Sequence, residues 1–137
     1  MKKILLDTNI IIDALADRNP YAAPAQQILI DAAEGRTDAY VTATTVTDIA
    51  YLLHKYQHNA SKVRRILADL FDSISILDVT SADCTNALTG ILADYEDAVM
   101  EQCAFRNSMD LLITRNLKDF KNSRVTVISS AQYKDNH

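Results

Sequence analysis

Three polar residues, Asp7-Thr8-Asn9, follow directly after the apolar run Ile4–Leu6 near the start of the chain. This order is typical of a short buried strand that leads into a helix, here expected over Ile10–Ala16. In an α/β sheet, ligands bind in the crevice beyond the carboxyl ends of the strands, so a carboxylate there could hold a cation or act as a base. The alternative interpretation is that Asp7 or Asn9 only caps the helix.

Four further acids stand where they could reach that crevice: Asp48, Asp94, Asp97 and Asp119. Each alone has a structural explanation, as a helix cap, a first-turn acid or a surface residue. Asp94 and Asp97 are three residues apart at an expected helix start and therefore project from one face. Gathered around one pocket, such carboxylates repel one another unless a cation lies among them. Oxygen ligands of this kind suit Mg²⁺ or Mn²⁺, and the chemistry most often built this way is metal-assisted phosphodiester hydrolysis.

Short apolar runs predict the strands that position these acids. They are Ile4–Leu6, Ala39–Val41, Ser75–Leu77, Leu111–Ile113 and Val125–Ile128. Helical patterns lie between them, including one after Thr80 or Ser81 that carries Ala87, Leu88 and Ile91. Strands alternating with helices indicate an α/β fold, a three-layer sandwich in which helices cover both faces of a mostly parallel sheet of four to five strands.

In a parallel sheet, residues that follow the strands lie at one edge and residues that precede them lie at the opposite edge. Asp7 leaves the first strand, Thr42 to Thr44 leave the second, and Thr114 to Asn116 leave the strand that begins at Leu111. These groups should surround one crevice. Asp110 enters its strand at the opposite edge, so we exclude it from the site and expect a turn or surface role.

Composition limits the classes of protein that the chain can be. Its 137 residues, 48% hydrophobic and 23% charged, are typical of one globular domain. Two glycines exclude a glycine-rich phosphate loop, and a net charge of −4 argues against a general nucleic-acid coat. Cys84 and Cys103 lack metal-site spacing and are expected to be buried or half-buried. Without an apolar stretch of membrane length or a signal peptide, we expect a cytoplasmic protein that does not bind membranes.

The ordered motifs resemble the PIN domain. They are Asp7-Thr8-Asn9, Thr44 to Asp48, Asp94-Tyr95-Glu96-Asp97-Ala98, and Thr114-Arg115-Asn116 to Asp119-Phe120. The resemblance is to the bacterial branch of small single-domain PIN proteins similar to VapC-type toxins. It runs from Lys3 to about Ile128 and implies a single domain over residues 1–137, with a core of about 3–128 and a C-terminal tail over 129–137.

The resemblance implies an endoribonuclease that uses Mg²⁺ or Mn²⁺ to cleave single-stranded RNA, often a toxin paired with an antitoxin protein and commonly a homodimer. By position, Asp7 and Asp97 match the metal-binding acids, and Asn116 and Asp119 match the fourth acidic region. Four residues match positions that support the ligands or contact substrate: Thr8, Asn9, Thr114 and Arg115.

The chain departs from the family pattern at Asp48, where Glu is usual and this branch can carry Asn. Asp is one methylene shorter, so it could hold a metal through water, and Asp94 could add a compensating carboxylate. This departure supports an alternative, a catalytically weak or degenerate PIN scaffold that binds RNA or a protein partner. A haloacid dehalogenase-type phosphatase is disfavoured because residue 9 is Asn, where those enzymes carry a second Asp.

Overall fold

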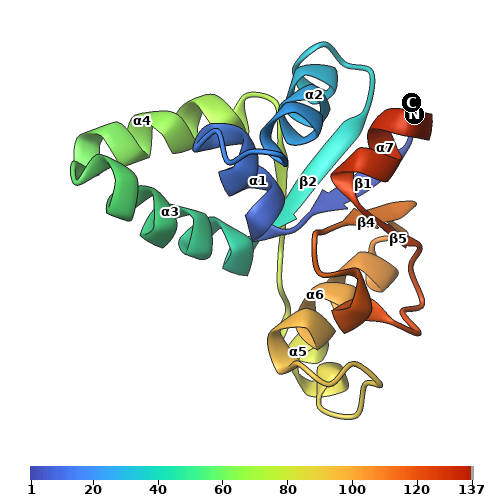
Figure 1. The fold of residues 1–137 in the computed structure, drawn as a ribbon. Coiled ribbons are helices and arrows are strands. Elements are labelled where there is room, and N and C mark those ends of the chain that lie inside the picture. Colours follow the sequence, from blue (N-terminus) through green and yellow to red (C-terminus); the bar gives the residue numbers. More distant parts are fainter. Residues whose placement is uncertain (137) are drawn as a thin grey trace.

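The computed structural model describes residues 1–136, in which the chain forms a five-stranded parallel sheet of order β3-β2-β1-β4-β5 (Figure 1). The strands are β1 (Lys3–Leu6), β2 (Asp38–Thr42), β3 (Ser75–Leu77), β4 (Leu111–Ile113) and β5 (Val127–Ile128). The α/β fold predicted from the sequence is thereby confirmed. The last strand is shorter than predicted, because only Val127 and Ile128 pair with β4.

Helices connect the strands and cover both faces of the sheet. They are α1 (Thr8–Leu15), α2 (Ala22–Ala33), α3 (Ala43–Gln57), α4 (Ala60–Phe71), α5 (Ser81–Ala87), α6 (Tyr95–Arg106) and α7 (Ser130–Asn136), with a 3-10 turn, η1, at Leu117–Phe120. None of the helices in the described part of the chain has the length and apolar character needed to cross a membrane.

The alternation of side chains along β1 separates the core into two sides. Ile4 and Leu6 pack with α1, α2, α3 and α4, whereas Leu5 packs on the other face with residues of α5 and α6. All three side chains are fully buried. The central strand is therefore apolar on both faces, as expected for a parallel sheet between helical layers.

The parallel register brings the carboxyl ends of three strands to one edge. Leu6 is paired with Ile113, and the Asp7 N–H donates to the Ile113 carbonyl at 3.0 Å. At the opposite edge the Lys3 N–H donates to the Asp110 carboxylate at 2.8 Å. Asp110 thus lies away from Asp7, as predicted.

Two segments differ from the sequence prediction. The helix expected to include Leu88 and Ile91 ends at Ala87, and both side chains are about 70% exposed. The chain leaves the helix there because the Gly90 N–H turns back to the Ala87 carbonyl. Within the expected tail over 129–137, Ser130–Asn136 form α7, which packs against α2 and buries Tyr133 with its hydroxyl donating to Asp31 at 2.9 Å, while residue 137 lies outside the described part of the chain.

Candidate active site

Asp7 combines the two roles that its position suggested. It is the N-cap of α1, where its Oδ1 accepts from the Thr8 N–H at 2.7 Å. Its Oδ2 accepts a hydrogen bond, also at 2.7 Å, from the hydroxyl of Thr114, the residue that directly follows β4. Burial and the nearby charge of Asp48 raise the pKa of Asp7, while the hydrogen bonds from Thr114 and Thr8 oppose that rise. A structural cap and a candidate ligand are here the same carboxylate.

The turn after β4 is joined to the turn after β1 by side-chain contacts. The Asn116 N–H donates to the Thr114 hydroxyl at 3.1 Å, and the Arg115 N–H donates to the Asn9 side-chain carbonyl at 3.3 Å. Thr114 is fully buried. The residues that sequence reasoning assigned to supporting positions therefore hold Asp7 and the β4 turn in a fixed relation.

Asp97 lies in the first turn of α6, which Asp94 caps by accepting from the Asp97 N–H at 3.0 Å. The Asp97 side chain is half-buried. Burial is the largest cause that raises its pKa to about 7, followed by the charges of Asp94, Asp7, Asp119 and Glu96. Since these charges come from three separate chain segments, the structure brings together acids that the sequence placed around one crevice.

Glu96 is a member of this cluster that sequence reasoning missed. Its carboxyl group hydrogen-bonds Asp48, and this contact is the largest cause that raises the pKa of Glu96. Little in the sequence indicated this role for Glu96. Asp94 and Asp97 share a helix face because they are three residues apart, whereas Glu96 lies between them and is not at that spacing from either. Only the approach of α3 to the start of α6 shows that Glu96 meets Asp48.

These side chains line a cleft of about 630 Å³. The predicted residues at its wall are Asp7, Thr8, Asn9, Asp48, Asp94, Asp97, Arg115, Asn116 and Asp119. Glu96, Arg18, Tyr51 and Leu52 also line it and were not predicted. Thr114 lies beneath the wall and acts through its hydrogen bonds.

Arg115 is oriented by a buried acid, Asp13, that sequence reasoning also missed. The Arg115 Nε lies 3.0 Å from the Asp13 Oδ2, at an angle that makes it an ion pair without a hydrogen bond. Arg18 binds the other oxygen of Asp13 at 2.9 Å, and the Arg115 guanidinium lies 4.2 Å from the centre of the Tyr21 ring. Asp13 is fully buried, and an acid within an apolar helix segment signals such a partner because a buried charge must be paired.

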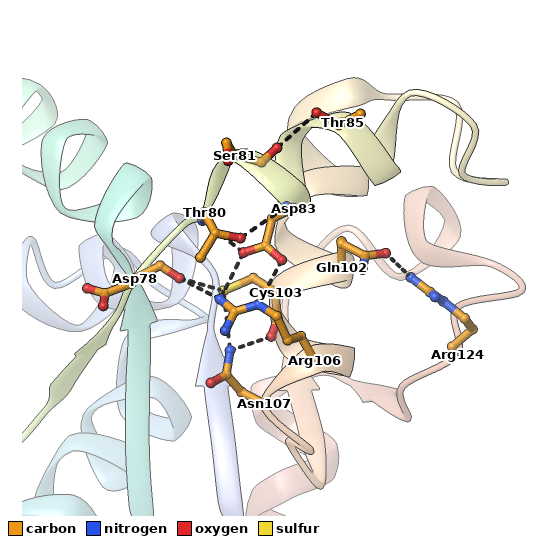
Figure 2. Close-up of polar contacts among 10 residues, drawn as sticks. All are labelled: Asp78, Thr80, Ser81, Asp83, Thr85, Gln102, Cys103, Arg106, Asn107 and Arg124. Carbon is orange, nitrogen blue, oxygen red and sulfur yellow. Dashed lines mark hydrogen bonds and ion pairs between the residues drawn. The ribbon is translucent and has the colours of Figure 1, made fainter.

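The far end of α6 is fixed by a second buried carboxylate, which Figure 2 shows. The Arg106 Nε and Nη2 donate to the two oxygens of Asp83 at 2.8 and 2.9 Å. The same Nη2 donates to the Asp78 carbonyl at 2.9 Å, and the Cys103 thiol lies 3.4 Å from that carbonyl. These contacts bind α6, which carries Asp94 and Asp97 at its other end, to α5 and to the segment after β3.

A family model of the PIN domain matches residues 3–118. The chain belongs to the PIN domain family. No curated protein sequence matches it significantly.

Solved structures share this PIN fold. A chain of VapBC-1 from nontypeable Haemophilus influenzae is 18% identical with a TM-score of 0.69, covering 94% of this chain and 98% of that one. A chain of a toxin-antitoxin complex from Klebsiella pneumoniae is 25% identical with a TM-score of 0.67, and the match covers 93% of this chain and 97% of that one. VapC20 of Mycobacterium tuberculosis, described as a Sarcin-Ricin loop cleaving toxin, is 11% identical with a TM-score of 0.63, and the match covers 80% of this chain and 86% of that one.

The donor set of this PIN domain suits a hard divalent cation, because carboxylate and amide oxygens converge without a thiolate or imidazole at the cleft wall. Burial is the first cause of the raised pKa values of Asp7 and Asp97, and the contact with Asp48 is the first cause for Glu96; the charges of neighbouring acids raise all three further. Across residues 1–136, however, no three His, Cys, Asp or Glu side chains are already placed to hold one ion together. A shared ion would need side-chain rotations that bring these carboxylates closer together.

Proposed function

We propose that this PIN domain is a divalent-metal-dependent endoribonuclease that cleaves single-stranded RNA. The observation that carries the proposal is the convergence of Asp7, Asp48, Asp97 and Asp119 on one cleft. Asp7 and Asp97 would anchor Mg²⁺ or Mn²⁺, with Asp94 and Asn116 adding oxygen ligands.

Such an ion, if held there, would supply an activated water and offset negative charge on the scissile phosphate. The chain's own residues prepare the site. Thr114 and Thr8 direct both oxygens of Asp7 by donating to them, and Asp94 fixes the first turn of α6 on which Asp97 lies. Arg115, held by Asp13, is placed at the cleft wall where it can donate to a phosphate oxygen.

The matched structures support the finer parts of the proposal. One neighbour is described as a toxin that cleaves the Sarcin-Ricin loop, and others come from toxin-antitoxin complexes. We accordingly propose that the chain is the toxin of such a pair and binds an antitoxin protein. We also propose a homodimer, for which the exposed apolar side chains Leu88 and Ile91 offer contact surface.

The test is a cleavage assay on end-labelled RNAs, structured and unstructured, with Mn²⁺ or with chelator. Wild-type protein should cut only with metal and leave a 5′-phosphate and a 3′-hydroxyl. Asp97→Asn should lose at least about a hundredfold in rate, since it removes a group that acts only through the metal. Asp110→Asn, at the opposite edge of the sheet, is the matched control and should cut like the wild type.

A wild-type protein that binds these RNAs with Mn²⁺ and never cuts them would contradict the proposal. That result would favour the non-catalytic scaffold suggested by the short Asp48 side chain. Equal cutting by wild type and Asp97→Asn would contradict the assignment of the site.

A further inference from the structure

One face of α3 continues the cleft away from the carboxylates. Asp48, Tyr51, Leu52 and Lys55 are spaced three, four and seven residues along this helix, so they share one side of it. Asp48, Tyr51 and Leu52 line the cleft wall. In Figure 1, α3 begins at the carboxyl end of β2 and runs outward from the sheet. Tyr51 follows Asp48 by three residues and therefore lies about one turn further along the helix.

Tyr51 differs from Tyr40, Tyr95 and Tyr133, whose hydroxyls donate to protein oxygens. The Tyr51 side chain is 65% exposed at the rim of the cleft. The Lys55 ammonium lies 4.9 Å from the centre of its ring, a cation–π contact one turn further along α3.

An acidic cleft in a chain of net charge −4 repels RNA, so a substrate needs attractive contacts outside the carboxylates. An exposed aromatic ring supplies one that does not depend on base sequence, because every nucleobase has a face that can stack. A lysine beside that ring can contact a backbone phosphate. Lys118 and Lys121 line an adjoining cavity of about 250 Å³ that shares Asp94 and Asp119 with the cleft and contains no residue of α3.

We propose that Tyr51 is a nucleobase-binding residue: its ring stacks on an unpaired base of the RNA next to the phosphate at the carboxylates, and Lys55 contacts the backbone beyond it. This inference rests on the proposed ribonuclease function. In this arrangement the RNA on one side of the phosphate at the carboxylates runs along α3, and the RNA on the other side runs towards Lys118 and Lys121. It also gives a physical reason for a preference for single strands, since a stacked base must leave its own duplex.

The test measures binding in an Asp97→Asn background, so that cleavage does not remove the probe. Short single-stranded RNAs carry 2-aminopurine at each position in turn, and its fluorescence is quenched when an aromatic ring stacks on it. Tyr51→Ala should weaken binding about tenfold and remove quenching at one position, whereas Tyr51→Phe should keep both because the ring remains. Tyr56→Ala is the matched control, because Tyr56 is 51% exposed on the same helix and does not line the cleft.

The outcomes separate this inference from the proposed function. If the parent protein binds and Tyr51→Ala binds and quenches equally well, the stacking role is wrong while the ribonuclease proposal stands, and the exposed ring is then open to a protein partner. A loss of the same size in Tyr56→Ala would also overturn the stacking role. If the parent protein binds none of the RNAs, both proposals fail.

Discussion

Replacing Asp97 by Asn should stabilise the protein when no metal is present. The substitution keeps the size of the side chain and removes one negative charge from the cleft. In the folded protein, burial and the charges of Asp94, Asp7, Asp119 and Glu96 raise the pKa of Asp97 to about 7. The ionised form of Asp97 is therefore unfavourable in the folded state and normal in the unfolded chain.

The magnitude and the sign follow from this shift. A rise of the pKa from the ordinary aspartate value to about 7 corresponds to about 4 kcal/mol. Because Asp97 is only half-buried, solvent screening reduces the expected effect to about 1–2 kcal/mol. The folded state holds the proton more tightly than the unfolded state, so stability is full at low pH and falls as the pH rises towards 7.

Urea denaturation with chelator present, at pH 5 and at pH 8, measures the effect. At pH 8 the free energy of unfolding of Asp97→Asn should exceed that of the wild type by about 1–2 kcal/mol, and at pH 5 the difference should be smaller. With Mn²⁺ added at pH 8 the wild type should become more stable than Asp97→Asn, because the ion stabilises only the protein that binds it. A variant that is less stable than the wild type at both pH values would refute the argument that Asp97 is crowded by like charges.

Four further substitutions test other parts of the site. Thr114→Val should lower the free energy of unfolding by about 1–2 kcal/mol in urea, because the buried Asp7 loses its 2.7 Å donor, while Thr114→Ser should remain near the wild type. Asp13→Ala should cost about 3 kcal/mol in the same assay because two arginines lose a buried partner, and a loss below about 1 kcal/mol would contradict this. Asp83→Asn should destabilise by about 2–3 kcal/mol at pH 7, and its deficit should vanish as acid protonates the wild-type carboxylate, whose pKa Arg106 holds low. Glu96→Gln should weaken Mn²⁺ binding about tenfold by calorimetry, and unchanged affinity would exclude Glu96 from the ligand environment.

The sequence predicted the fold well where hydrophobic periodicity was strong. Residues 4–6 and 111–113 were apolar at every position, as buried parallel strands are, and in the structure they form two neighbouring strands. Helix α7 was not predicted because its sequence is mostly polar. It is stabilised by long-range contacts, among them that of the buried Tyr133 with Asp31, which no local pattern reveals.

The candidate site could be predicted to the extent that strand ends define it. Asp7, Thr114 and Asn116 follow from the rule that carboxyl ends of parallel strands share an edge. Glu96 and Asp13 could not be found in that way, since their partners come from packing between helices. Tyr51 was one of several scattered tyrosines in the sequence, and only the path of α3 brings it to the cleft.

Anomalous diffraction from crystals soaked in Mn²⁺ and measured at the manganese edge tests the central claim most directly. We predict one strong peak between the Asp7 and Asp97 carboxylates that is missing from crystals of Asp97→Asn. Peaks confined to the surface, with an empty cleft in well-ordered crystals, would contradict it.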